Sequence, residues 1–445
     1  MAHTAMVQCT VRILCGIWLF LLLLEQGTAQ SARDWWLRSN EFRTRYYNVK
    51  TDLRETHARH LAQHMDITYE SYAELFAGLK AQSPKRLDLY LFASQEDYIP
   101  TLRARFNAEG TGSWGMAISR GSETSLVAWQ GKYSLGDMES VLQHEGFHQF
   151  ARYLFPELPS WANEGLAEIF QRGVPIESRI VLGEVTAQDL LRLAKANQDR
   201  KFRSFAQFFT MDQRVWNQHV QRGDANTNYL QAWCLVHFFL YADGAKYQPG
   251  FINFLVGLNQ GASWQEAFVR AYGTPNFERM EKKWIEYIAQ LQPTDYRQTI
   301  RQLDYLAAGM KELHTKEIYP LSFEELKQEL RQISFQHTSK LFHQAEDLQT
   351  TDANFRIPAG TLRDGRKLPA SLLNNSEKIV REFRLVDAKG QLLETPTDEK
   401  KREKIRRRLA CKPLEIVTVG LEPRTFRVGW RGSSKRGFQP VFSVE

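Results

Sequence analysis

The chain has 445 residues, of which 43% are apolar and 24% are charged, as is ordinary for a globular protein with one large core or two domains. The net charge of +7 is spread along the sequence, so it suits anionic surfaces or substrates without selecting a partner. The 4 cysteines, two of which lie in the first 15 residues, exclude a fold whose stability rests on a disulfide framework.

The first 29 residues have the organisation of a secretory signal peptide. Arg12 precedes an apolar run, Ile13–Leu24, which is too short to span a membrane comfortably. Gly27 and Ala29 supply the small residues of a cleavage site after Ala29. We therefore expect an exported protein, periplasmic or extracellular. We do not expect nucleic acid as a partner, because exported proteins rarely encounter it. An uncleaved membrane anchor is the alternative.

The part of the chain up to residue 135 mixes strand and helix patterns. Alternation of apolar and polar residues predicts strands, and apolar residues near a 3.6-residue period predict helices. The predicted strands are Phe42–Val49, Arg86–Ser94 and a hairpin of Trp114–Ser119 and Ser125–Gln130 that turns through Arg120–Thr124. The predicted helices are a long one over residues 53–80 and a short one over Ser94–Phe106.

From Leu135 the pattern becomes one of successive helices. The predicted helices are Asp137–Leu154, a helix capped by Ser160 that runs to Gln171, a helix after the cap Thr186, Asn228–Gly244, and three short helices between residues 251 and 291. A sheet-bearing part followed by a helical part indicates the α+β class. Cys234 lies in the apolar run "WCLVHFFL", which favours a buried free thiol over a disulfide with Cys411.

The pattern of apolar and polar residues changes again after Leu291, and we place a domain boundary near Pro293. The predicted domains are therefore residues 30–296 and a mixed α/β extension, residues 297–445. The extension is expected to hold a helix over Ser322–Ala345, a hairpin over residues 381–396 and three more short strands towards the C-terminus. Lys400–Arg408 is strongly basic and predicts a solvated helix between two strands, with contact to an anionic surface as the alternative.

The stretch "HEGFH" places two histidines four residues apart with a glutamate between them. Helical residues four apart lie one turn apart on the same face, so His144 and His148 can point both imidazoles at a single ion. Imidazole with a carboxylate as third donor is the ligand set of a catalytic zinc. Glu145 is offset around the helix, where it can take a proton from a water molecule at that zinc.

Further carboxylates follow on the next predicted helix, in "WANEGLAEIF". Glu164 and Glu168 are four residues apart, and burying two carboxylates against two histidines is expensive without a cation. We assign Glu164 to the metal and expect Glu168 to accept the free N–H of a ligand histidine, although the reverse assignment stays open. In the alternative interpretation the histidines belong to the core or the surface and both glutamates are solvated.

These two stretches resemble the gluzincin metallopeptidases, and the helices that follow resemble their peptidase MA-like branch. The likeness covers about residues 40–290 and implies a zincin-like fold, zinc (Zn2+) held by His144, His148 and Glu164, and Glu145 as general base. It matches Glu168 to the carboxylate one turn beyond the third ligand. It also implies that a strand like Ser125–Gln130 borders the cleft and pairs with an extended substrate.

The chain departs from the best-known gluzincins in two respects. Fifteen residues separate His148 from Glu164, which is a few fewer than in those branches and shortens the connecting loop. The predicted hairpin over residues 114–130 contains no "GxMEN"-type exopeptidase sequence, so the resemblance does not extend to an aminopeptidase. Superfamily enzymes often stabilise the oxyanion with a later Tyr or His, and Tyr229, with His237 behind it, is our candidate. The alternative is that Tyr229 is a packing residue.

Together these features predict an exported zinc-dependent peptide hydrolase that acts on a peptide or protein substrate. One alternative is an inactive binding or scaffold protein on the same fold. Another is a zinc amidase that cleaves a non-peptide amide of the cell-wall type, because the motif reports the activation of water and not the bond that is cleaved. The sequence does not fix an oligomeric state.

Three more histidines share one stripe of the helix predicted over residues 53–80. His57, His60 and His64 have a spacing that could bind a metal ion. No carboxylate is placed as cleanly as Glu164, and the stripe adjoins the solvent side. We therefore expect a polar helix face at these positions.

Overall fold

The computed structural model describes residues 34–80, 84–273, 277–357, 360, 362, 366–369, 372, 380–393, 396–433 and 436–445. The predicted signal peptide, residues 1–29, lies outside the described residues. By its internal contacts the chain divides into two compact units, Met1–Phe155 and Pro156–Glu445. Within the described ranges, no helix combines the length and the apolar character that crossing a membrane requires. The mixture of helices with several small sheets confirms the α+β class.

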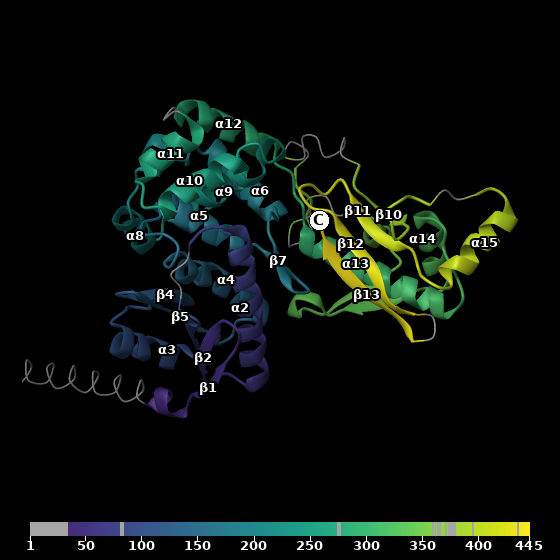
Figure 1. Ribbon diagram of the computed structural model, residues 1–445, viewed down its shortest axis with the longest axis horizontal. Helices are drawn as coiled ribbons and strands as arrows, with labels where there is room; N and C mark the ends of the chain where they lie inside the picture. The colour runs from purple at the N-terminus through teal and green to yellow at the C-terminus, as the bar shows by residue number, and fades with distance from the viewer. Residues whose placement is uncertain are drawn as a thin grey trace, which may run out of the picture. The chain divides into compact units, whose positions relative to one another are not determined.

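The first unit is built on a mixed sheet with the strand order β1-β2-β3-β5-β4 (Figure 1). Its central strands β2, β3 and β5 are parallel, while β1 and β4 pair antiparallel at the two edges. The strands are β1 (Asn40–Arg43), β2 (Tyr47–Thr51), β3 (Leu87–Phe92), β4 (Gly115–Arg120) and β5 (Glu123–Trp129). The helices are α2 (Glu55–Leu75), α3 (Gln95–Thr101), its π-helical continuation Leu102–Phe106, and α4 (Leu135–Ala151).

Apolar residues on both faces of this sheet form two cores. Leu89 and Leu126 belong to the core that α2 and α4 cover. Phe92 and Val127 belong to a second core, with residues of α3. Because successive residues of a strand point to opposite faces, β3 and β5 are apolar on both sides. Figure 1 shows α3 on the side of the sheet away from α4.

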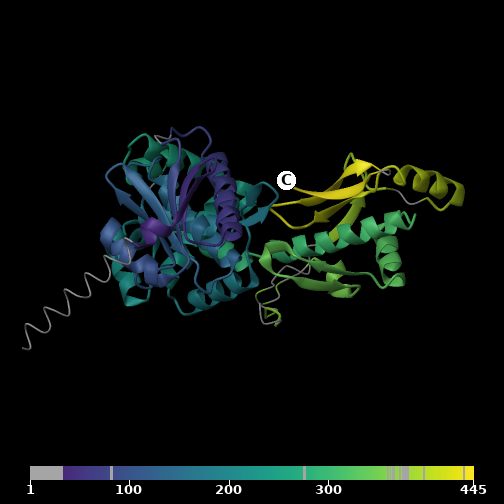
Figure 2. The ribbon, with the colours of Figure 1, turned by 90° about the horizontal axis from the view of Figure 1, so that it is seen from below.

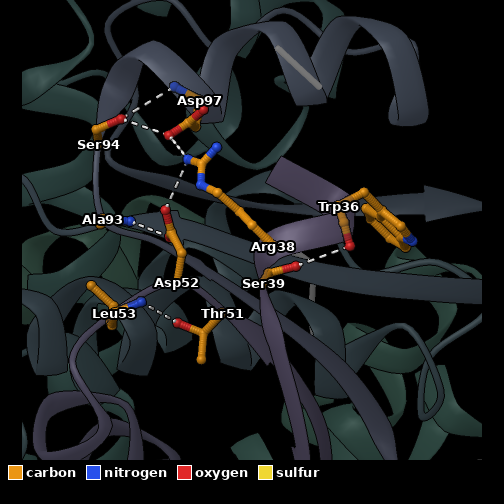
Figure 3. A network of polar contacts seen from close by, with 9 residues as sticks. All are labelled: Trp36, Arg38, Ser39, Thr51, Asp52, Leu53, Ala93, Ser94 and Asp97. Carbon is orange, nitrogen blue, oxygen red and sulfur yellow. Dashed lines mark hydrogen bonds and ion pairs between the residues drawn. The ribbon is translucent and has the colours of Figure 1, made fainter. Parts of the chain in front are cut away.

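A polar network joins the segment before β1 to the sheet and to α3 (Figure 3). The Arg38 guanidinium donates to the carboxylates of Asp52 and Asp97. The other Asp52 oxygen accepts the Ala93 N–H at 2.8 Å, and Ser94 caps α3 by accepting the Asp97 N–H. The network fixes the ends of β2 and β3 relative to one another, and with them the sheet against which α4 packs.

The second unit begins with a bundle of helices around α9. Helix α9 is buried over most of its length, and α5, α6, α10 and α12 all pack against it. The helices are α5 (Ser160–Gln171), α6 (Ala187–Gln198), α7 (Phe205–Phe209), α8 (Gln213–Arg222), α9 (Asn226–Ala245), α10 (Gln248–Asn259), α11 (Trp264–Tyr272) and α12 (Phe277–Gln290). A short hairpin, β6 (Val174–Ile176) and β7 (Arg179–Val181), follows α5.

The rest of the second unit packs an antiparallel sheet, β10-β11-β12-β13, along helix α13 (Figure 2). Its helices are α13 (Tyr296–Thr315), α14 (Phe323–Gln332) and α15 (Glu399–Leu409), with 3-10 turns at Leu341–His343 and Asp352–Phe355. Its strands are β8 (Gln336–Ser339), β9 (Glu346–Gln349), β10 (Glu382–Val386), β11 (Glu415–Val419), β12 (Phe426–Ser433) and β13 (Gly437–Val444).

The hairpin β6–β7 shares one apolar core with this later part of the chain. Val174 and Val181 lie in the same cluster as Leu303 of α13 and Val428 of β12. Residues 297–445 are therefore packed against part of the preceding region. The domain limits 30–296 and 297–445 stay a prediction.

The basic run Lys400–Arg408 forms most of α15, which connects β10 to β11 as predicted. Asp398 caps the helix by accepting the Lys401 N–H at 2.8 Å. Several of its arginines pair with glutamates, for example Arg406 with Glu399 at 3.0 Å. Contact of this helix with an anionic surface stays a prediction.

Several predicted helix boundaries were wrong. Ser160 is the first helical residue of α5 and not its cap, which is Pro159. The helix predicted over Ser322–Ala345 ends at Gln332, because Ser334 takes up a left-handed conformation with φ 49° and the chain continues into β8 and β9. The sequence did not predict helices α7 and α8.

Cys234 and Cys411 are both free, and Cys234 is buried as predicted.

Two histidines of α2 lie against one carboxylate of α4. His60 Nε2 lies 2.6 Å from Glu139 Oε1, and His64 Nδ1 lies 3.6 Å from the same oxygen. The expectation of a polar face on the solvent side was therefore wrong for His64, which is buried because α4 covers that part of α2.

Glu184 makes stability depend on pH. Its buried carboxyl accepts the Arg297 N–H at 3.0 Å, and burial raises its pKa from 4.5 to about 7. A raised carboxyl pKa stabilises the folded state below pH 4.5, and this contribution is lost as the pH rises to 7. The loss amounts to about 3 kcal/mol.

We expect the variant Glu184→Gln to show a smaller fall in the free energy of unfolding between pH 4.5 and pH 8 than the wild type. Glutamine keeps an acceptor for the Arg297 N–H but does not titrate. Urea denaturation of both proteins at several pH values measures the difference. Equal pH dependence in the two proteins would show that Glu184 titrates normally.

Candidate metal centre

Helix α4 carries the motif "HEGFH" and starts at a well-formed cap. The Ser134 hydroxyl accepts the Asp137 N–H at 3.1 Å, and the Asp137 carboxylate accepts the Ser134 N–H at 3.0 Å. This reciprocal pair is a capping box, and it moves the start of the helix two residues ahead of the predicted Asp137. Leu142 and Phe147 are buried on α4, whereas the motif's polar side chains are only half-buried.

Gly146, inside the motif, lets α2 approach α4 closely. A Cβ at this position would lie 2.6 Å from the Met65 methyl group and 3.0 Å from the Tyr72 hydroxyl. Tyr72 donates from that hydroxyl to the Gln143 carbonyl at 2.6 Å. The glycine therefore belongs to the packing that fixes the helix, and the chemistry of the motif lies with its neighbours.

His144 and His148 present their rings side by side on α4. The ring centroids are 4.9 Å apart and the ring planes make an angle of 77°. Between them Glu145 accepts the backbone N–H of Ala117 on β4 at 3.1 Å. The structure thus places the predicted general base against the end strand of the sheet.

Ala117 offers this N–H because of its position in the hairpin. The Trp129 N–H donates to the Trp114 carbonyl just before β4. Every second residue from Trp114 onwards therefore directs its backbone N–H and carbonyl groups towards β5. Ala117, opposite Leu126, falls between these positions, and its N–H points away from β5. The outer side of β4 therefore faces Glu145.

This geometry corrects the expectation that Ser125–Gln130 is the strand that pairs with substrate. Residues 125–129 belong to β5, which is hydrogen-bonded to β3 on one side and to β4 on the other. Of the two hairpin strands it is β4 that lies at an edge of the sheet, and β1 forms the opposite edge. An extended ligand can add to β4 but not to β5.

A cavity of about 480 Å³ opens at the end of the hairpin where β4 begins. Trp114 is 41% exposed, and its ring stacks on that of Tyr133 with centroids 3.8 Å apart. Trp129 and Lys132 line the same cavity. Since Trp114 precedes Ala117 by three residues, the cavity begins about 10 Å along the strand from Glu145's hydrogen bond.

Helix α5, which carries "NEGLAE", is seated on α9 through Gly165. A Cβ at Gly165 would lie 2.5 Å from the Ala232 carbonyl oxygen and 2.5 Å from a methyl group of Val236. The neighbouring Glu164 is only 6% exposed. Burial of a carboxylate calls for a compensating cation or hydrogen bonds.

The variant Gly165→Ala is expected to destabilise the protein by about 1–3 kcal/mol, because the backbone of α9 cannot move aside. This net loss remains after the stabilisation of about 1 kcal/mol that alanine provides over glycine inside a helix. Gly146→Ala is expected to cost less, since the Met65 methyl group is the far end of a flexible side chain. Thermal unfolding of both variants tests this, and an unchanged or raised Tm for Gly165→Ala would contradict it.

The structure groups His144, His148 and Glu164 as side chains that could hold one metal ion. Their ligand atoms all lie within 4.8 Å of one another. Two imidazole nitrogens and one carboxylate oxygen are the donor set of catalytic zinc sites, which keep a further position for water. The residues present therefore fit zinc in number and in chemistry.

Glu168 is held in a network of charged side chains that the sequence did not reveal. Its carboxylate accepts from the Arg172 guanidinium, one turn further along the chain. Arg172 also pairs with Asp189 at 3.4 Å and lies over the ring of Trp233 at 4.6 Å from the ring centroid. The spacing of Glu168 and Arg172 could have signalled their pairing. The additional role of Glu168 in orienting a ligand histidine stays a prediction.

Tyr229 and His237 differ in their surroundings. Tyr229 is half-buried in the first turns of α9, and its ring meets that of Trp216 edge to face at 5.2 Å. His237 is buried, with Nδ1 2.6 Å from the Tyr287 hydroxyl, and burial lowers its pKa to about 4. His237 is thus a neutral core histidine, and the catalytic role of Tyr229 stays a prediction.

Comparison with protein families finds a match to the family described as "Protein of unknown function (DUF1570)". Only a part of the chain is similar to this family. It covers residues 139–255, from the first turns of α4 into α10, and so contains His144, Glu145, His148 and Glu164. No curated protein matches the chain significantly. The matched residues therefore include the parts of α4 and α5 that carry the candidate site.

Proposed function

We propose that the protein is an exported zinc metallopeptidase of the gluzincin type. The observation that carries the proposal is the grouping of His144, His148 and Glu164, with their ligand atoms within 4.8 Å of one another. The N-terminal sequence supports export. The resemblance of "HEGFH" and "NEGLAE" to gluzincin motifs supports the type.

Glu145 acts in this proposal as the general base and then as the acid. A zinc ion bound by the three ligands supplies a Lewis acid that lowers the pKa of a water molecule. One oxygen of Glu145 is oriented by the Ala117 N–H, and its carboxylate takes a proton from the attacking water. Glu145 then passes the proton to the leaving amine, which balances the hydrolysis.

The free edge of β4 favours a peptide over a non-peptide amide as the substrate. An extended peptide can add to this edge through its main chain, so that its carbonyl groups run past Glu145. A side chain of the substrate can enter the cavity beside Trp114 and Tyr133, because the cavity lies along the same strand. A cell-wall type of amide has no regular main chain to pair in this way.

The metal content of the purified full chain tests the proposal. We expect the wild type, prepared without chelators, to contain zinc and to cleave a peptide library, and we expect Glu164→Ala to lose that zinc and the activity together. Glu157→Ala serves as a control because Glu157 is an exposed carboxylate in the loop before α5. Mass spectrometry for metals gives the stoichiometry.

Three outcomes would overturn the proposal. Wild-type protein without zinc would favour a binding or scaffold protein on the same fold. Zinc-loaded protein that leaves the peptide library intact but hydrolyses a cell-wall-type amide would favour the amidase. Loss of zinc in Glu164→Ala with unchanged peptide cleavage would remove the metal from the mechanism.

A further inference from the structure

The exposed cations of α15 lie on one side of the helix. Successive residues of an α-helix are about 100° apart around its axis, so residues four or seven positions apart share a side. Five exposed cations therefore fall within an arc of about 120°: Lys400, Lys401, Lys404, Arg407 and Arg408. They span about 12 Å along the helix. We call these five residues the basic stripe.

Contacts on the opposite side of α15 hold the helix in this orientation. Leu409 is buried in the apolar core that also contains Ile416 of β11, and Ile405 packs against the same core. Arg402, on the same side as these two residues, donates to the carboxylate of Glu325 on α14. A helix that is anchored in this way by packing and by an ion pair keeps the basic stripe towards the solvent.

Most of the charge on the basic stripe is not neutralised. Arg407 pairs with Glu403 at 3.4 Å. In the part of the chain that the structure describes, the other four cations of the stripe form no ion pair. The remaining carboxylate within α15, Glu399, pairs with Arg402 and Arg406, which lie outside the stripe. Several uncompensated positive charges on one short helix produce a strongly positive surface.

This arrangement of charges is unfavourable for the helix itself. Lys400, Lys404 and Arg408 follow one another at intervals of four residues, where like charges destabilise a helix. Lys400 and Lys401 also lie in the first turn of α15, where the helix dipole disfavours cations. A surface that opposes the stability of its own helix is expected at a functional site, where an anionic ligand offsets the repulsion.

We propose that the basic stripe binds a linear anionic polysaccharide, in which carboxylate or sulfate groups recur along an extended chain. The stripe is one helix wide, and Glu399 and Glu403 flank it on one side, so it fits a narrow chain of anions better than a broad anionic surface. Helices that bind a membrane surface insert apolar side chains, whereas the apolar residues Ile405 and Leu409 of α15 face the core. The surface does not depend on the proposed peptidase activity.

Binding of the purified full chain to a heparin oligosaccharide, which is a sulfated linear polysaccharide, tests the proposal. Calorimetric titration at several salt concentrations gives the affinity and its salt dependence. We expect the triple variant Lys400→Gln, Lys404→Gln and Arg408→Gln to bind about 10–100 times more weakly than the wild type. The slope of log K against log salt should become shallower by about two, since fewer counterions are released.

A matched triple variant separates the stripe from the net charge. Lys195→Gln, Lys201→Gln and Lys282→Gln remove the same charge from exposed lysines outside α15, and this protein should bind as the wild type does. Thermal unfolding without ligand is an independent measurement. Since the stripe variant loses like-charge pairs, its Tm should be unchanged or raised while its binding is weakened. Lys404→Gln alone gives the same comparison if the triple variant folds poorly.

Three results would overturn the proposal. The first is a wild type that does not bind the heparin oligosaccharide at physiological salt. The second is an equal loss of affinity in both triple variants, which would assign the binding to net charge alone. The third is tighter binding to vesicles of anionic lipid, or to single-stranded DNA, than to the oligosaccharide, which would assign the stripe to a different class of partner.

Discussion

The variant Glu145→Gln should hydrolyse peptides about 10²–10⁴ times more slowly than the wild type while keeping its zinc. Glutamine has the shape of glutamate and an oxygen that can accept the Ala117 N–H, so the local structure is retained. It cannot take a proton from water. Because Glu145 is not among the grouped metal-binding side chains, the metal content should not change.

The measurement is kcat/KM on a peptide cleaved by the wild type, together with the zinc stoichiometry of both proteins. Glu157→Gln is a matched control, since it removes one exposed carboxylate close by in sequence and should leave both quantities unchanged. If Glu145→Gln cleaves at the wild-type rate, Glu145 is not the base and the proposed mechanism is wrong.

Tyr229→Phe should lower kcat by about 10²–10³ with little change in KM, if its hydroxyl donates to the oxyanion. Such a donor acts mainly in the transition state, so its loss affects turnover more than substrate binding. Phenylalanine keeps the edge-to-face contact with Trp216, and the fold should therefore be unaffected. Steady-state kinetics and thermal unfolding separate the two effects.

Tyr247→Phe is the control for this experiment. Tyr247 also loses only a hydroxyl, one that donates to Asp243 at 3.4 Å at the end of α9. We expect its kcat to equal that of the wild type. An unchanged kcat in Tyr229→Phe would leave Tyr229 as the packing residue that the sequence offered as its alternative.

The parts of the site that could be predicted from the sequence are those fixed by one helix. The position of His148 relative to His144 follows from the helical repeat, and the structure shows the two rings 4.9 Å apart. The caps at Thr186 and the hairpin of β4 and β5 follow from local patterns in the same way. These features need no knowledge of how distant segments pack.

Other parts depend on segments that are far apart in the sequence. His60 and Glu139 are 79 positions apart, and no periodicity indicates that α2 presents its histidines to α4. The choice of β4 over β5 as the free edge likewise depends on β3, which pairs with β5 across a long connection. The roles of Gly146 and Gly165 become visible only when the neighbouring helices are in place.

The backbone N–H of Ala117 can donate either to the Glu145 carboxylate, as it does in the structure, or to a carbonyl of a peptide that adds to β4. A peptide that adds to β4 needs outward N–H groups of this strand, and Ala117 offers one that Glu145 already holds. Arrival of the substrate would release the carboxylate at the moment when a proton must be taken. Until then the bond shields part of an exposed strand edge from pairing with other chains. In the proposed peptidase the same contact would thus hold Glu145 away from water before substrate binds and protect the edge of β4 from aggregation.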